Sequence, residues 1–230
     1  MSLDKAVLIS HCAGVCPTPR TEILDEGTDL AAWAGPCLVK PRRGSGGRGV
    51  QIIDDGRDPL DTPRDGSFIL QELLPGEEFS VDTLCSLQGD VLATVPRLRL
   101  KVDSGIAVTG RTLHDADLQK YAGAVAAHLG VTFVANVQFK RDAAGTPRLL
   151  EVNVRFPGTM PLTIASGVNM PRLSLDMLLD RPLPKNVGEF RDIGMVRFWS
   201  ERYVSPSEIE ALERQAARLK EQPAALPRSA

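Results

Sequence analysis

Two alternating segments joined by six turn-forming residues constrain the fold more than any other feature of the chain. Residues 132–141 and 148–155 alternate apolar and polar side chains, and the sextet Asp142-Ala-Ala-Gly-Thr-Pro147 separates them. Period-two alternation is typical of strands, and a short turn-rich connection joins antiparallel neighbours. We therefore predict a β-hairpin. Helices and antiparallel strands otherwise follow one another in mixed order, without repeated βαβ units, which favours an α+β fold.

The register of this hairpin decides which polar side chains meet. With the turn centred at residues 144–145, Gln138 faces Glu151 and Asn136 faces Asn153. Directly opposed Cβ atoms lie roughly 4.5 to 5.5 Å apart. One face of the hairpin therefore gathers a carboxylate and several amide oxygens within a few ångström.

The second strand of the hairpin divides between two faces. Glu151, Asn153 and Arg155 are expected on the polar face, and Leu150, Val152 and Val154 on the apolar one. Oxygen ligands suit Mg²⁺, which takes only one or two protein carboxylates and completes its shell with water and phosphates. A solvent-exposed hairpin face is the alternative, and these residues alone leave both open.

A glycine-rich loop over residues 42–49 lies between predicted strands at 37–41 and 50–53. A dinucleotide-binding site needs a helix after the glycines, so the strand excludes it, and no GK[ST] follows to make a P-loop. The backbone N–H groups of such a loop can fold over phosphate oxygens, and Lys40 places a cation beside them. A mobile surface turn is the alternative interpretation.

Composition excludes several classes of partner. The 230 residues carry a formal charge of −2 and the pI is near 6.0, so no bulk charge favours nucleic acid or an anionic membrane. No apolar run approaches the roughly 18 residues of a membrane span. The four cysteines form no CxxC pair, so we expect no zinc site but reduced, buried thiols in a cytoplasmic protein.

The remaining periodic segments complete the expected elements. Helices are predicted at 4–12, 28–34, 115–129, 160–166, 170–179 and 205–220, the last opened by a capping box at Ser205-Pro-Ser-Glu208. Further strands are predicted at 68–71, 78–87, 91–100 and 193–200.

Four segments together resemble the ATP-grasp superfamily and, within it, the carbamoyl phosphate synthetase-like branch of carboxylate ligases. They are LVKPRRGSGGRGV (38–50), LQELLPGEEFSVD (70–82), ANVQF (135–139) and LLEVNVRFPGT (149–159). The resemblance runs from residue 4 to about 202. It implies an ATP-grasp domain at 4–204, whose two α/β subdomains with antiparallel sheets, about 35–90 and 91–204, grip the nucleotide. A helix at 205–220 and a disordered tail at 221–230 would follow.

The same resemblance implies a role for individual residues. Those expected to hold the triphosphate are Lys40, Gly44, Ser45, Gly46, Gly47 and Gly49. The backbone at Glu72 and Leu74 would bind the adenine edge, and Glu78 the ribose hydroxyls. Those expected to ligate two magnesium (or manganese) ions are Gln138, Glu151 and Asn153. Arg155 would lie beside the transferring phosphoryl group and share the catalytic role with Lys40.

The implied activity is that of a Mg²⁺-dependent ligase that uses ATP to activate a small carboxylate as an acyl phosphate for attack by an amine or similar nucleophile. Relatives carry a preceding α/β substrate domain, which would be separate or deleted here. Alternatives are a non-catalytic ATP-binding or regulatory domain and the ATP-binding subunit of a larger carbamoyl phosphate synthetase-like enzyme. A basic strand with Arg97, Arg99 and Lys101 is either a substrate contact or a solvated face.

Overall fold

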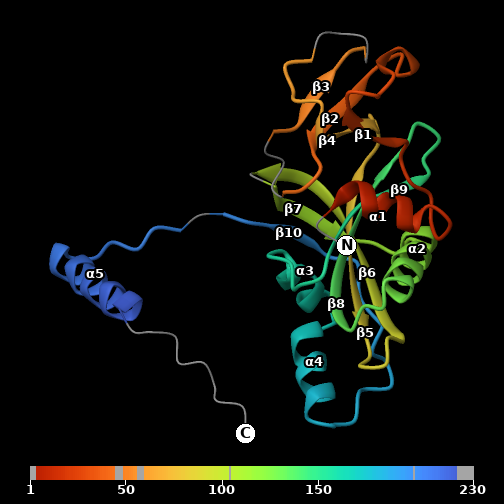
Figure 1. Ribbon diagram of the computed structural model, residues 1–230. Helices are drawn as coiled ribbons and strands as arrows, with labels where there is room; N and C mark the ends of the chain where they lie inside the picture. The colour runs from red at the N-terminus through yellow and green to blue at the C-terminus, as the bar shows by residue number, and fades with distance from the viewer. Residues whose placement is uncertain (1–3, 45–48, 56–59, 104, 199, 222–230) are drawn as a thin grey trace, which may run out of the picture. The chain divides into compact units, whose positions relative to one another are not determined.

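An α+β unit, Met1–Arg197, is followed by a second unit, Phe198–Ala230, in the computed structural model (Figure 1). The structure describes residues 4–44, 49–55, 60–103, 105–198 and 200–221. The first unit contains two antiparallel sheets, which confirms the predicted fold class. The expected tail beyond Glu221 lies outside the described residues.

The smaller sheet has four strands in the order β1-β4-β2-β3. Its strands are β1 (Thr21–Asp25), β4 (Asp65–Glu72), β2 (Cys37–Pro41) and β3 (Gln51–Ile53). The predicted strands on either side of the glycine-rich loop are therefore confirmed. A short 3-10 helix, η1 (Leu30–Ala32), packs its Leu30 against the core of this sheet, which includes Trp33 and Val39.

The larger sheet has six strands in the order β10-β7-β6-β5-β8-β9. They are β10 (Gly194–Val196), β7 (Ile106–Thr112), β6 (Val91–Asp103), β5 (Glu78–Cys85), β8 (Phe133–Arg141) and β9 (Pro147–Asn153). Sheet membership departs from the expected division of the chain. β1 joins the smaller sheet although it precedes residue 35, and β5 joins the larger one although it precedes residue 90. Alternation identifies a strand but does not say with which neighbour it pairs.

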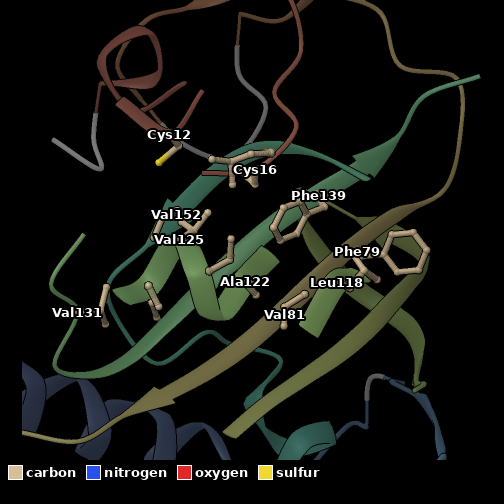
Figure 2. Close-up of a cluster of buried hydrophobic side chains, with 14 of the residues drawn as sticks. Cys12, Cys16, Phe79, Val81, Leu118, Ala122, Val125, Val131, Phe139 and Val152 are labelled. Carbon is tan, nitrogen blue, oxygen red and sulfur yellow. The ribbon is translucent and has the colours of Figure 1, made fainter. Parts of the chain in front are cut away.

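One face of the larger sheet is apolar and covered by α1 (Lys5–Cys12) and α2 (Ala116–His128). Figure 2 shows Leu118 and Ala122 with Val81 and Phe139 in this layer. The sequence sets the bounds of α2 as predicted: the Asp115 carboxylate accepts a bond from the Leu118 N–H at 3.0 Å, and a glycine with positive φ follows the helix.

The opposite face of the larger sheet is only partly apolar. Leu84, Val95 and Val134 pack against α3 (Met160–Ser166) and α4 (Met170–Leu178). The rest of that face carries polar side chains, among them Asp82 and Asn136. This polar half is where the predicted metal ligands lie.

The second unit contains α5 (Pro206–Glu221). The predicted capping box is confirmed, because the Ser205 N–H donates to Glu208 Oε2 at 2.9 Å and the Glu208 N–H donates to Ser205 Oγ at 3.3 Å. Among the described helices, none is long and apolar enough to cross a membrane. All four cysteines are buried, as predicted.

Candidate functional site

A cavity of about 720 Å³ is lined by both sheets and by the first residue of α1. Its lining includes seven of the residues to which the resemblance assigns a role: Lys40, Gly44, Glu72, Leu74, Glu78, Gln138 and Glu151. Among described residues, Gly49, Asn153 and Arg155 are outside that lining. Ser45, Gly46 and Gly47 lie outside the part of the chain that the structure describes. The fold thus brings together residues that are more than a hundred positions apart.

Lys40 is a buried cation on β2. Val39 points into the core of the smaller sheet, so alternation sends the Lys40 side chain to the other face, where it lines the cavity. Its Nζ donates to Gln71 Oε1 at 2.7 Å. Burial, and next the positive charge of Lys5, lower the pKa of Lys40 to about 8, against the opposing effect of Glu151. Lys40 therefore stays charged at neutral pH and titrates slightly above it.

Lys5 is a second cavity lysine, and no sequence motif points to a role for it. Asp4 caps α1 and accepts a bond from Arg42 Nε at 2.8 Å, which holds the first turn of the helix beside the end of β2. Lys5 Nζ donates to the carbonyls of Pro41 at 3.2 Å and Gly44 at 3.0 Å. Burial lowers the pKa of Lys5. Its position depends on contacts across almost forty residues, which no local pattern shows.

The residues expected around the adenine and ribose all line the cavity. Glu72 ends β4, and its Oε2 accepts a bond from the Arg20 N–H at 3.1 Å. Leu74 is buried, and Glu78 opens β5 and forms an ion pair with Arg99. This part of the lining thus combines the apolar side chain of Leu74 with two carboxylates.

The predicted register of the β8–β9 hairpin is confirmed where it matters for the site. Gln138 pairs with Glu151 and Asn136 with Asn153. Nearer the turn the pairing differs by one residue, because Leu150 is an extra residue on β9, a β-bulge. The prediction that Leu150 lies on the apolar face is therefore wrong: it lines the cavity together with Glu151.

The polar face of the β8–β9 hairpin offers oxygen atoms from one carboxylate and two or three amides. Asn153 Nδ2 donates to Glu151 Oε1 at 2.9 Å, and Gln138 Oε1 accepts from Arg99 Nη1 at 3.0 Å. The described residues contain no group of three His, Cys, Asp or Glu side chains suited to a metal. One carboxylate and one amide oxygen in the cavity, with the Asn153 amide bonded to that carboxylate, fit Mg²⁺, whose remaining ligands are water and phosphate.

Arg155 and Gly49 lie outside the cavity lining, whereas Gly44 is part of it. β9 ends at Asn153, so Arg155 lies beyond the strand, exposed, and its Nη1 donates to the Phe156 carbonyl at 3.4 Å. Gly44 and Gly49 have φ of +132° and +71°. This conformation favours glycine, and at Gly49 an added Cβ would lie 3.0 Å from Pro41 Cγ.

The basic strand does not form a solvated face. Arg97 is only 2% exposed and pairs with Asp82 at 2.7 Å, whereas Arg99 lines the cavity. Lys101 is exposed and follows an irregularity in the β6–β7 pairing, so the three cations do not continue one regular row.

Comparison with known proteins identifies the family. Residues 64–198 match the family described as "ATP-grasp in the biosynthetic pathway with Ter operon". The chain belongs to this ATP-grasp family. A 103-residue stretch of the ATP-grasp chain is 31% identical to D-alanine–D-alanine ligase from Thermotoga maritima. The match covers 43% of this chain and 34% of that protein, so the chain spans about a third of its curated relative.

Solved structures show the same ATP-grasp fold. Biotin carboxylase from Campylobacter jejuni matches with a TM-score of 0.69 and 15% identity over 80% of this chain and 47% of that one. Carboxyaminoimidazole ribonucleotide synthase from Aspergillus clavatus, complexed with ATP, matches with a TM-score of 0.67 and 20% identity over 83% of this chain and 55% of that one. The narrower carbamoyl phosphate synthetase-like assignment stays a prediction.

Proposed function

We propose that this ATP-grasp protein is an ATP-dependent ligase that activates a carboxylate as an acyl phosphate for attack by an amine. The observation that carries the proposal is the shared cavity of Lys40, Glu78, Gln138 and Glu151. Its described lining has five basic residues against three acidic ones, a balance that suits a polyanion bound with a divalent cation.

In this proposal the nucleotide spans the cavity from wall to wall. The base lies beside Leu74 and the end of β4, and the phosphates lie toward Lys40, Lys5 and the glycine-rich loop. Glu78 accepts from the ribose hydroxyls. The relative complexed with ATP supports a nucleotide in this fold, although its identity to this chain is only 20%.

Magnesium would be held by Gln138, Glu151 and Asn153, with phosphate oxygens completing the shell. When bound, it neutralises charge on the phosphates during transfer. The carboxylate oxygen attacks the γ-phosphorus, and the bond from that phosphorus to the leaving ADP oxygen breaks. The amine nitrogen then attacks the acyl carbon, loses a proton and displaces phosphate. Lys40, and Arg155 as the resemblance implies, would stabilise the transferring group by charge.

Transfer of oxygen tests this chemistry directly. The full chain, ATP, Mg²⁺, an amine and a panel of ¹⁸O-carboxylate acids should give inorganic phosphate containing one ¹⁸O atom, and Glu151→Gln should give none. Hydroxylamine in place of the amine should yield a hydroxamate. Phosphate released from the wild type without label would contradict an acyl phosphate.

A further inference from the structure

A buried ion pair between Asp82 and Arg97 lies on the polar face of the larger sheet, next to the proposed metal site. Asp82 is fully buried and accepts bonds from Arg97 Nη2 at 2.7 Å, from Asn136 Nδ2 at 2.7 Å and from Thr163 Oγ1 at 2.5 Å. Arg97 also donates to Thr159 Oγ1 at 2.5 Å. None of these residues lines the cavity, and the reaction proposed above uses none of them.

Asn136 connects this pair to the cavity. It is 2% exposed, pairs across the sheet with Asp82, and its Oδ1 accepts a bond from Gln138 Nε2 at 3.3 Å. Gln138 Oε1 therefore points away from Asn136, toward the side where Arg99 donates to it at 3.0 Å. An amide oxygen has two lone pairs, so one remains for a cation.

The chemistry of the groups fixes the direction of both amides. An ionised carboxylate only accepts hydrogen bonds, so Asp82 requires the nitrogen of Asn136 on its side. The oxygen of Asn136 then faces Gln138 and requires the nitrogen of that amide in turn. Without the Asp82–Asn136 bond, the bond from Arg99 alone would hold the Gln138 amide, which would then turn more readily and present Nε2, an atom that cannot ligate a metal, to the site.

We propose that Asp82 acts through Asn136 as a positioning residue that turns Gln138 Oε1 toward a divalent cation. This inference rests on the proposed function, because it assigns Gln138 to the metal. Partners of this kind orient ligands in many metal sites, and their loss typically weakens metal affinity by roughly 10- to 100-fold. A merely structural Asp82 network would contribute to folding and leave metal affinity unchanged.

The chain offers a matched pair of variants. Asn136→Leu removes one bond from Asp82 and also frees the Gln138 amide. Thr163→Val likewise removes one bond from Asp82, but Thr163 has no contact with Gln138 among the described bonds. Both keep the Asp82–Arg97 pair, whose disruption would leave a buried charge unpaired. If Asn136→Leu does not fold, Asn136→Ser breaks the same bonds without added apolar bulk.

The measurement is Mn²⁺ binding in the presence of ADP at one fixed temperature. The electron paramagnetic resonance signal of free Mn²⁺ reports how much of the ion remains unbound. We expect Asn136→Leu to weaken Mn²⁺ affinity about 10-fold or more. ADP affinity in EDTA should stay unchanged in both variants, and Thr163→Val should bind Mn²⁺ like the wild type. Equal effects of the two variants, or none, would overturn the positioning role while leaving the proposed function standing. Wild-type protein that binds no Mn²⁺ with ADP would overturn both.

Discussion

Glu151 faces Gln138 across the β8–β9 hairpin, and one extra residue, Leu150, separates that pairing from the register at the turn. In a regular strand Leu150 and Glu151 would point to opposite faces. The bulge places both side chains at the cavity, while Leu149 on the other side remains fully buried in the core. The hairpin thus supplies a carboxylate and an apolar surface at adjacent positions.

Truncation of the two neighbouring leucines of β9 should therefore affect different properties: nucleotide affinity at Leu150 and stability at Leu149. Leu150→Ala is expected to weaken ADP binding about 10-fold, corresponding to about 1.4 kcal/mol of lost apolar contact, with little change in unfolding. Leu149→Ala should lower the free energy of unfolding by about 2–5 kcal/mol because it leaves a core cavity. Calorimetric titration and urea unfolding of both variants test this. A nucleotide affinity that is insensitive to Leu150→Ala would place the ligand elsewhere.

The low pKa of Lys40 predicts pH-dependent nucleotide binding. The group is charged below its pKa of about 8 and loses the charge above it, so affinity for ADP should fall as pH rises through that value. Bound phosphate favours the charged form, so binding near pH 8 should take up a proton.

Titration calorimetry in two buffers of different ionisation enthalpy measures that uptake. Lys40→Met should lose most of the proton uptake. A smaller remainder would come from Lys5, because burial lowers its pKa as well. Proton uptake as large in Lys40→Met as in the wild type would show that the proton does not bind to Lys40.

The attachment of α1 predicts a specific acid sensitivity. The bond from Arg42 is the largest effect on Asp4 and lowers the pKa of its carboxyl from 3.8 to about 2. The stabilisation is therefore present above about pH 4 and lost as pH falls toward 2.

Asp4→Asn keeps a good helix cap but removes the charge. It should unfold at lower urea concentration than wild type at pH 7, and the difference should shrink between pH 4 and pH 2.5. A constant difference over that range would show that the ion pair adds nothing to stability.

The hairpin pairing of Gln138 and Glu151 could be predicted because alternation and a turn sextet act within twenty residues. The bulge at Leu150 could not be predicted. Next to the turn Lys140 pairs with Arg148, whereas Gln138 and Glu151 pair in a register shifted by one residue, and no sequence pattern marks the shift. β7 escaped prediction because Gly110 interrupts its pattern. That glycine is required by packing, as an added Cβ would lie 2.6 Å from the Leu98 carbonyl oxygen.

Long-range contacts account for two placements that the sequence does not reveal. The Asp4–Arg42 bond holds the start of α1 so that Lys5 reaches the cavity, and the buried Arg97 finds its partners in Asp82 on the next strand and in Thr159. The motifs identify the chemistry of the site, whereas the packing of strands and helices decides which basic side chains lie in it.

The most direct test of the account is the thermal unfolding midpoint of the full chain with ADP, with and without Mg²⁺, beside Lys40→Met and Glu151→Gln. A ligand that binds only the folded state stabilises it by about 2.7 kcal/mol at a hundredfold excess over its dissociation constant. We predict a rise in the wild-type midpoint that increases with Mg²⁺, is lost in Lys40→Met, and no longer depends on Mg²⁺ in Glu151→Gln. An unchanged wild-type midpoint at millimolar ADP and Mg²⁺ would contradict the nucleotide site.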